Sequence, residues 1–267
     1  MIQFDPQGHE YKTIDDKHID WTSVTTLGGK FKEPFDAKKI SEKSVKNKKS
    51  KWFGLDPVEV RGIWTREGER GMSLGNWYHD QREVDVLSCK TIKRYGLTLP
   101  VIHSMENEQG KKIASSQRLA DGIYPEHLVY LQSVGLIGQI DLLEIANGLV
   151  YISDYKTNKK IDYKSYVNWE GISKKMSSPI DHLEDCNYIH YALQLSTYAY
   201  MVLRHNPKLK IGELFINHIR FKLLGKDKYD YPIYDTDKDG NYIVQEIVPV
   251  EVPYLKSDVQ LMINTLK

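Results

Sequence analysis

The stretch over residues 138–157, GQIDLLEIANGLVYISDYKT, constrains the fold more than any other part of this sequence. It contains two short apolar runs separated by Asn147-Gly148. Both residues of this dipeptide tolerate a positive φ angle, which a tight turn between antiparallel strands requires. The stretch therefore predicts a β-hairpin, and we interpret the rest of the chain as support for one face of it.

Two carboxylates and a lysine lie at the strand ends of this hairpin. Asp141 is near the start of the first strand, Asp154 is near the end of the second, and Lys156 follows two positions later. Side chains two positions apart in a strand point to the same face. Two acids and a lysine on one face can hold a divalent metal ion and direct a water molecule at a phosphate.

The composition narrows the alternatives. The 267-residue chain has a formal net charge of +1, so any nucleic-acid footprint must be a local patch. Cys89 and Cys186 lack CxxC spacing, which excludes a four-cysteine site within the chain and suits a reducing compartment. The sequence has no apolar run of membrane-spanning length and no signal-peptide pattern. We expect an intracellular, cytoplasmic protein without a membrane segment.

Three segments precede the hairpin. Residues 56–88 are expected to be helical, and His79 and Glu83 share one helix face, as an ordinary contact or as part of a metal site. A helix is also expected over residues 106–120. Residues 125–132 predict a strand that brings Glu126 beside the hairpin, either as a third acid at the metal ion or as a solvated edge residue.

The segments after the hairpin supply further candidates. Residues 158–187 are polar, and we interpret them as an excursion that covers or flanks the candidate site. Residues 188–205 predict a largely buried helix on which Gln194 and Tyr198, four positions apart, project together. A strand over residues 214–221 and an amphipathic helix over residues 257–266 are expected to close the chain.

The N-terminal part is expected to form a small β-meander over residues 1–25. Ser23 or Thr25 would then cap a helix that carries Leu27, Phe31 and Phe35 inward.

A basic stretch follows over residues 38–51. It is either a solvated surface or a phosphate-contacting patch, in which case Trp52 and Phe53 would be available to stack on bases.

Residues 235–246, DTDKDGNYIVQE, match the calcium-loop pattern at every specified position between Asp235 and Glu246. A calcium loop of this kind needs a helix on each side. Pro249 and Pro253 forbid the second helix, and Asp239-Gly240 between two β-prone runs is a hairpin turn signal. We therefore expect a plain hairpin here.

Four short motifs occur in one order within residues 71–205. They are His79 in GNWYHDQRE, Gly138-Gln-Ile-Asp141, Asp154-Tyr-Lys156 and Gln194-Leu-Ser-Thr-Tyr198. Each motif alone is common, but their order resembles the PD-(D/E)XK nuclease superfamily in its RecB-like exonuclease branch. That branch also includes the Cas4 and mitochondrial genome maintenance exonucleases. The N-terminal SVTTLGGKFKEPFD and the C-terminal strand and helix resemble the flanks of phage-encoded members.

The resemblance implies a metal centre that binds Mg²⁺ or Mn²⁺. Asp141 and Asp154 would be metal ligands, and the Tyr155 carbonyl oxygen would complete the set. Lys156 would orient or deprotonate the attacking water and offset charge on the phosphate. Burial could lower the pKa of such a lysine toward a useful value.

The resemblance also implies supporting roles. His79 would bind a second metal ion or position the substrate, while Gln194 and Tyr198 would contact the nucleic-acid backbone and steady Lys156. Glu83 and Glu126 are auxiliary candidates. Members with an iron–sulfur cluster use four cysteines, and helicase motors carry a P-loop. The chain has neither pattern, so we expect no iron–sulfur cluster and no ATP.

These inferences combine into one hypothesis. We expect an α/β fold with a mixed central β-sheet flanked by helices, as in a restriction-endonuclease-like core. Residues 1–267 would form a single nuclease domain, with an N-terminal helical and basic flank (1–70), a catalytic core (71–221) and a C-terminal hairpin and helix (222–267).

The expected activity is metal-dependent DNA exonuclease, acting on single strands or duplex ends in phage or mobile-element recombination, repair or replication. Recombination or replication proteins would be its partners. The alternatives are a structure-specific endonuclease on the same fold and a non-catalytic nucleic-acid-binding protein. The resemblance leaves strand polarity and oligomeric state open.

Overall fold

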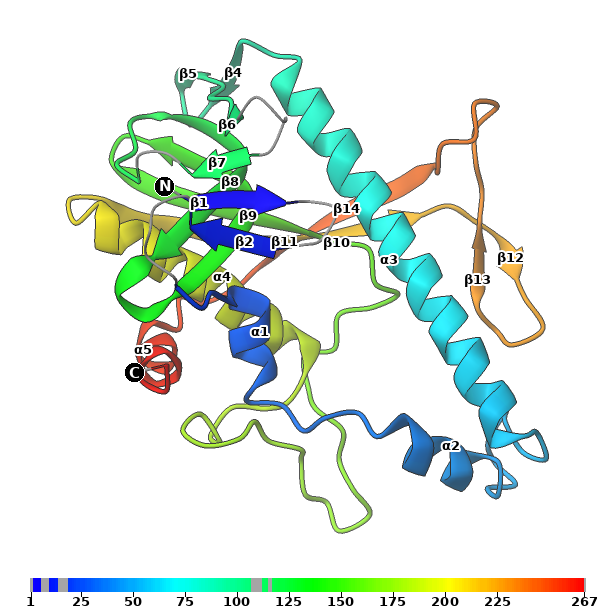
Figure 1. Ribbon diagram of the computed structural model, residues 1–267. Coiled ribbons are helices and arrows are strands. Elements are labelled where there is room, and N and C mark those ends of the chain that lie inside the picture. Colours follow the sequence, from blue (N-terminus) through cyan, green and yellow to red (C-terminus); the bar gives the residue numbers. More distant parts are fainter. Residues whose placement is uncertain (1, 6–9, 14–18, 107–111, 115–116, 267) are drawn as a thin grey trace.

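A six-stranded mixed sheet lies at the centre of the molecule, with helices on both of its faces (Figure 1). The structure is a computed structural model, and it describes residues 2–5, 10–13, 19–106, 112–114 and 117–266. The predicted α/β class, with a mixed central sheet flanked by helices, is confirmed.

The strands of the central sheet run in the order β14-β11-β10-β9, and β8 and β3 both pair with β9. β10 and β11 are parallel, as are β3 and β9, and the other neighbours are antiparallel. Their bounds are β3 (Thr22–Ser23), β8 (Gly122–Leu131), β9 (Leu136–Ala146), β10 (Leu149–Lys156), β11 (Lys210–Phe221) and β14 (Val244–Glu251). The predicted strands near residues 125–132 and 214–221 are therefore confirmed.

The predicted hairpin is the middle of this sheet. β9 and β10 pair antiparallel, with Leu149 opposite Ala146. The connecting residues Asn147 and Gly148 have φ angles of 54° and 75°. A type I′ turn needs positive φ at both central residues, which explains the Asn-Gly dipeptide.

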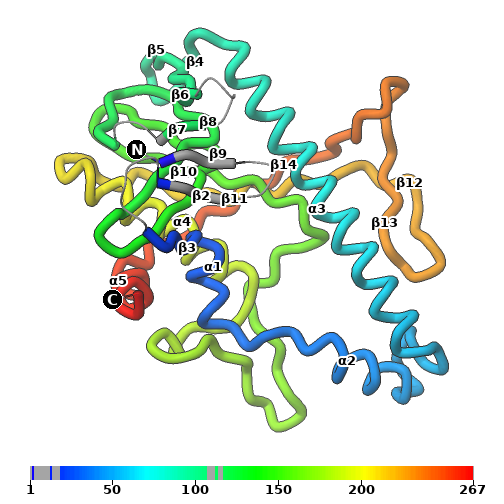
Figure 2. The backbone as a smooth tube through the Cα atoms, in the orientation of Figure 1, coloured from blue at the N-terminus to red at the C-terminus, as the bar shows by residue number. Residues whose placement is uncertain are grey.

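Three helices cover one face of the sheet: α1 (Val24–Gly29), α4 (Asn187–His205) and α5 (Lys256–Asn264). Apolar side chains of α4, including Leu195 and Val202, are buried in one core with Ile140, Val150 and Ile152 of the sheet. The C-terminal α5 lies beside α1 and α4 in the backbone trace (Figure 2). The predicted helices near residues 188–205 and 257–266 are confirmed.

The long helix α3 (Pro57–Leu87) crosses the opposite face (Figure 1). It begins at Asp56, whose carboxylate accepts hydrogen bonds from the N–H groups of Val58 and Glu59 at 2.7 and 3.2 Å. Leu74 and Tyr78 of α3 pack against Ile219 and Phe221 of β11. The cap and the proline in the first turn explain where the predicted helix begins.

Smaller sheets lie at the edges of the molecule. They are formed by β1 (Ile2–Asp5), β2 (Glu10–Thr13), β6 (Met105–Glu106) and β7 (Lys112–Ala114), by β4 (Thr91–Arg94) with β5 (Leu97–Pro100), and by β12 (Leu223–Lys226) with β13 (Pro232–Tyr234). A 3₁₀ helix, η1 (Gln132–Val134), joins β8 to β9.

The helix predicted over residues 106–120 is wrong in the part that the structure describes. β6 and β7 stand there instead, and residues 107–111 and 115–116 lie outside the described part of the chain. Ile113 is paired with Met105 on one side and with Gln3 on the other. The extended form is supported by pairing with β1, more than a hundred residues earlier, which no local pattern in this segment reveals.

The N-terminal expectations are met only in part. β1 and β2 pair as a hairpin, but β3 joins the central sheet instead of continuing a meander, and residues 1, 6–9 and 14–18 are outside the described part. Ser23 caps α1, its hydroxyl accepting from Thr26 N–H at 3.0 Å. Leu27 and Phe31 are buried as predicted. Phe35 is 68% exposed, because the helix ends at Gly29 and Phe35 is beyond its inward face.

The basic stretch includes a short helix, α2 (Ala37–Ser44), beside the start of α3. In the alternative that this stretch contacts nucleic acid, the stacking role considered for Trp52 is wrong. Its ring is buried against Val60 and Ile63 of α3, with Tyr229 packed on the same cluster. Phe53 is 51% exposed.

The calcium-like segment forms the expected hairpin. Thr236 bridges Tyr242 antiparallel, Gly240 has a φ angle of 85°, and β14 follows where a calcium loop would need a helix. Two of the carboxylates that residues 235–246 would offer to a calcium ion are paired with cations: Asp235 with Lys222 and Glu246 with Arg220.

None of the helices in the described part of the chain combines the length and apolarity that crossing a membrane requires.

Candidate active site

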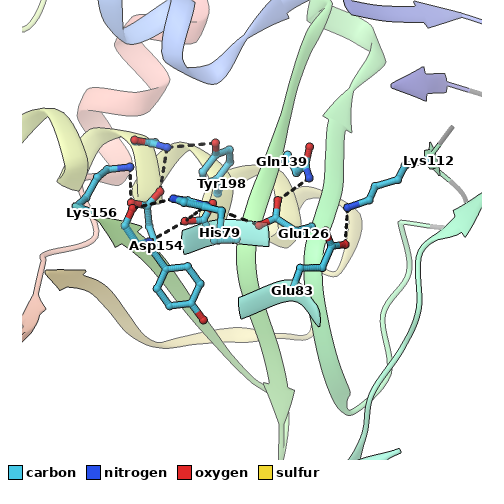
Figure 3. A network of polar contacts seen from close by, with 11 residues as sticks. His79, Glu83, Lys112, Glu126, Gln139, Asp154, Lys156 and Tyr198 are labelled. Carbon is cyan, nitrogen blue, oxygen red and sulfur yellow. Dashed lines mark hydrogen bonds and ion pairs between the residues drawn. The ribbon is translucent and has the colours of Figure 1, made fainter. Parts of the chain in front are cut away.

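A cavity of about 980 Å³ opens between α3, the sheet and the first half of α4. Side chains from α1, α3, α4, β7, β8, β9 and β10 line this catalytic cavity, and Figure 3 shows polar contacts among them. Eight of the nine candidate residues from the sequence contribute to its wall: His79, Glu83, Glu126, Asp141, Asp154, Tyr155, Lys156 and Gln194. Tyr198 is buried behind Gln194.

The sheet is irregular where β8 and β9 reach the cavity. The pairs Pro125–Leu142 and His127–Ile140 put Glu126 opposite Asp141, and Glu126 has a φ angle of 47°. Ile140 and Leu143 are three positions apart, yet both are buried in the α4-side core, so the alternation of faces shifts at Asp141. Here Glu126 and Asp141 both face α3.

His79, Glu126 and Asp141 form a three-residue group that could hold a metal ion. One ligand atom from each lies within 4.8 Å of the others. His79 Nδ1 is 3.4 Å from Asp141 Oδ2 and 3.8 Å from Glu126 Oε1. Glu126, which the sequence left as either a third acid or an edge residue, thus lies within the group.

Main-chain groups of Tyr155 orient two members of this group. Tyr155 N–H donates to Asp141 Oδ2 at 2.7 Å, and the Tyr155 carbonyl oxygen is 3.2 Å from His79 Nε2. A carbonyl can only accept, so Nε2 carries a proton, and Nδ1 is the nitrogen that faces the carboxylates. A histidine that ligates a metal through one nitrogen commonly donates its other N–H to such a carbonyl.

The electrostatics of the group also fit a divalent cation. Burial and the nearby charge of Asp154 raise the pKa of Asp141 well above its ordinary value. Burial acts to lower the pKa of His79, but its hydrogen bond to the Glu126 carboxylate and the charge of Asp141 raise it to about 9. Carboxylate oxygens and imidazole nitrogens are both common ligands of divalent metal ions. A cation at this point would offset negative charge that is otherwise shut away from water.

Asp154 and Lys156 form a second unit in the same cavity. Asp154 is buried, its Oδ2 lies 2.5 Å from Lys156 Nζ, and its Oδ1 accepts from Gln194 Nε2 at 3.1 Å. Gln194 Nε2 also donates to the Tyr198 hydroxyl at 3.3 Å. Asp154 is therefore held by Lys156 and Gln194, beside the three-residue group rather than within it.

The charge state of Lys156 differs from the expectation for a general base. Burial lowers its pKa, but the carboxylates of Asp154 and Asp141 outweigh burial, and the net pKa is above the ordinary value. The ammonium also lies 5.0 Å from the centre of the Tyr191 ring. In this arrangement Lys156 is a cation and a hydrogen-bond donor.

Two polar contacts complete the cavity wall. Glu83 is paired with Lys112 of β7 at 2.5 Å, so its carboxylate faces a cation rather than the three-residue group. Gln139 Nε2 donates to Glu126 Oε2 at 2.5 Å. Sequence reasoning missed Gln139, although it lies inside the G-x-x-D motif two positions before Asp141. Lys112 had no local signal, because it approaches Glu83 only through the folding of β7.

Comparison with known proteins agrees with this geometry. A family model described as "PD-(D/E)XK nuclease superfamily" matches residues 102–250, which is more than half of the chain. A search of curated proteins and a search of solved structures found no match. The matched region contains both aspartates, Lys156 and Gln194 on a mixed sheet flanked by helices, consistent with a restriction-endonuclease-like core. The chain belongs to the PD-(D/E)XK nuclease superfamily.

Proposed function

We propose that this protein is a Mg²⁺- or Mn²⁺-dependent DNA exonuclease of the RecB-like branch. The observation that supports this most is the meeting of two units in one cavity: the group of His79, Glu126 and Asp141, and the Asp154–Lys156 pair. A metal ion that activates water and a cation that offsets charge on the phosphate together suit phosphodiester hydrolysis.

His79, Glu126 and Asp141 would hold the metal ion, with Asp154 as a neighbouring carboxylate. The Tyr155 carbonyl oxygen accepts from His79 Nε2 and would orient the histidine instead of binding the same ion. When bound, the ion supplies a water nucleophile at neutral pH and relieves negative charge at phosphorus. Tyr155 N–H keeps the Asp141 carboxylate in position through its 2.7 Å hydrogen bond.

Lys156 would donate hydrogen bonds to the phosphate and offset its charge as the nucleophile attacks. Its pKa is raised, so it is ready to act as a cation rather than as a base. Asp154 sets the place of the Lys156 ammonium, and Gln194 in turn holds Asp154. Tyr198 supports this arrangement indirectly, because its hydroxyl accepts a hydrogen bond from Gln194.

The finer assignment rests on the order of the four sequence motifs. That order is typical of the RecB-like exonucleases, and the flanks resemble phage-encoded members. We therefore propose single strands or duplex ends of DNA as substrate, and recombination, repair or replication of phage or mobile-element DNA as the setting. Partner proteins would come from the same processes.

The test is a nuclease assay on linear single- and double-stranded DNA with Mg²⁺, with Mn²⁺ and with EDTA. Wild type should cut only with metal. Asp141→Ala and Lys156→Ala should each lower the rate about 100-fold or more, because each removes a group that acts on the transition state. Asp239→Ala, in an exposed turn remote from the cavity, is the matched control and should cut like wild type.

Metal-independent cutting, or equal rates for wild type and Lys156→Ala, would contradict the proposal. Covalently closed circular DNA distinguishes an exonuclease from a structure-specific endonuclease, because only an endonuclease cuts it. A protein that binds DNA tightly but cuts none of these substrates would instead be the non-catalytic alternative.

A further inference from the structure

A second, smaller cavity of about 290 Å³ adjoins the catalytic cavity. We call it the side pocket. Thr25, Lys156, Tyr191 and Gln194 line both cavities, so a ligand beside Lys156 reaches either one directly. No residue of the side pocket beyond these four has a place in the proposed reaction.

The side pocket has an apolar floor and a polar rim. Its floor is made by the buried side chains of Val24, Met176, Leu193 and Met262, which come from α1, the 157–186 connection, α4 and α5. Its rim carries polar side chains, which are Thr25, Lys32, Asn187 and His190. A flat aromatic base attached to a sugar and a phosphate has the same division between an apolar and a polar part.

The charge on the rim favours an anion. Within the described part of the chain, Lys32 makes no ion pair with a carboxylate, and Lys156 stands at the opening toward the catalytic cavity. The pocket lining includes no carboxylate, and Asp185, which contacts the rim residue His190 at 2.7 Å, is also paired with Lys174 at 2.8 Å. Lys32 is thus a cation beside an apolar pocket, without a carboxylate partner among the described residues.

The size of the side pocket limits its occupant. Sites for drug-sized molecules begin at about 300 Å³. The pocket has room for one small ligand and not for a continuing strand.

Resting on the proposed exonuclease function, we infer that the side pocket binds the terminal nucleotide of the strand being cut, its base on the apolar floor and its phosphate toward Lys32 and Lys156. The bond to be broken then lies at the junction of the two cavities. This occupant requires a strand end, which closed circular DNA does not have.

Two adjacent glycines in α1 offer a matched pair of variants. A Cβ atom built at Gly28 or at Gly29 meets no heavy atom within 4 Å. Gly28 lines the side pocket, whereas Gly29 lines neither cavity. Gly28→Leu should therefore fill the pocket, and Gly29→Leu should add the same side chain outside it. Neither glycine belongs to the metal group or to the Asp154–Lys156 unit.

The first measurement is binding of deoxythymidine 5′-monophosphate, by calorimetry in EDTA, so that no catalysis takes part. We expect wild type and Gly29→Leu to bind alike, and Gly28→Leu to bind about tenfold or more weakly, equivalent to about 1.4 kcal/mol. Lys32→Gln, a change of a partly exposed side chain, should weaken binding of the monophosphate but not of thymidine. Equal binding by the two leucine variants, or no binding by wild type at millimolar nucleotide, would overturn the inference.

The second measurement is metal-dependent release of nucleotides from linear DNA. Gly28→Leu should be slower than Gly29→Leu by about tenfold or more. If wild type cuts and the two variants are equally fast, the side pocket has no part in the reaction and this inference alone fails. If wild type binds the monophosphate but cuts no DNA with any metal, the proposed function fails and the nucleotide site stands. Circular dichroism of both variants confirms that they are folded.

Discussion

Gly138 explains at the level of one residue why the G-x-x-D motif contains a glycine. A Cβ atom at this position would lie 2.5 Å from Tyr198 Cε1 and 3.0 Å from Val24 Cγ2. The Tyr198 ring therefore packs directly on the backbone of β9. This contact keeps Tyr198 where Gln194 can donate to its hydroxyl.

We expect Gly138→Ala to destabilise the protein by about 1–3 kcal/mol, as is usual for overpacking, and to lower nuclease activity by displacing Tyr198 and Gln194. Urea unfolding and the cleavage assay measure the two effects. Gly71→Ala is the matched control: Gly71 is an exposed residue of α3 whose added Cβ meets nothing within 4 Å. It should stabilise the protein by about 0.5–1 kcal/mol. A Gly138→Ala protein as stable and active as wild type would contradict the packing argument.

His127 carries the second prediction at this scale. Its Nε2 is buried and has no hydrogen-bond partner among the residues that the structure describes, and burial lowers its pKa to about 4 from an ordinary value of 6.5. The unfolded chain therefore binds a proton between pH 6.5 and 4 that the folded protein does not. The stability due to neutral His127 is fully present above pH 6.5 and is lost as the pH falls toward 4.

The loss should amount to at most about 3 kcal/mol, at 1.36 kcal/mol per pH unit. Urea unfolding at pH 7.5, 5.5 and 4.5 tests it against His127→Phe, which keeps an aromatic ring for the edge contact with Tyr124. The difference in unfolding free energy between wild type and variant should shift against wild type as the pH falls. A constant difference across this range would show that His127 does not remain neutral in the fold.

At the scale of elements, the fold changed the interpretation of two charged segments in opposite directions. It leaves most lysines of the basic segment (residues 37–53) exposed, and it pairs acids of the calcium-like segment (residues 235–246) with cations. Residues 37–53 carry seven lysines and one glutamate in a chain whose net charge is +1. Six of these lysines, at positions 38, 39, 43, 46, 48 and 49, are exposed and make no ion pair within the described residues. The string over residues 235–246 instead has acids that pair with Lys222 and Arg220.

We expect the basic segment to contact DNA phosphates. Replacing Lys48 and Lys49 together by Gln should weaken DNA binding and lower the slope of log K against log salt by up to about 1.8, at about 0.9 per lost phosphate contact on a duplex. Fluorescence anisotropy across a salt series measures both. The control is the double change Lys208→Gln and Lys210→Gln, at the turn between α4 and β11. Lys156 is paired with His218 near the other end of β11, so this turn lies away from the candidate site. Equal slopes of log K against log salt for the two double variants would show that the basic segment is an ordinary solvated surface without DNA contacts.

For the molecule as a whole, the site joins elements that are far apart in the sequence. His79 comes from α3, Glu126 from β8, Asp141 from β9, Asp154 from β10 and Gln194 from α4. Unfolding disperses these groups, so a metal ion that binds only the assembled site must stabilise the entire fold.

Mg²⁺ or Mn²⁺ should therefore raise the melting temperature. At a concentration about 100 times Kd the added free energy of unfolding is about 2.7 kcal/mol, or a rise of about 5–10 °C for a chain of this size. Asp141→Asn should abolish the rise and stabilise the metal-free protein, because it removes one of the repelling carboxylates and can keep the hydrogen bond from Tyr155 N–H.

Asp237→Asn, in the calcium-like string, is the control and should keep the full metal effect. A calcium-induced rise that Asp237→Asn removes would instead reveal an ion site in residues 235–246. The absence of any metal effect on wild type would contradict the assignment of His79, Glu126 and Asp141.

The sequence by itself determined the features that depend on nearby residues. The Asn147-Gly148 turn follows from positive φ, α3 from its cap and first-turn proline, and α4 from its apolar periodicity. Asp154 and Lys156 share a face because strand side chains repeat every two positions. These are short-range rules, and they held wherever no distant contact overrode them.

Only the tertiary structure decided what depends on distant contacts. The local irregularity at Glu126 and Asp141 breaks the two-residue alternation, so no pattern in β8 or β9 alone could predict that both side chains face His79. Trp52 is buried by α3 and Tyr229, and β7 is extended because β1 pairs with it. The carboxylates raise the pKa of Lys156 only because folding brings them to it. Such interactions fall steeply with distance in space, and a distance between remote residues is set by the fold rather than by either local sequence.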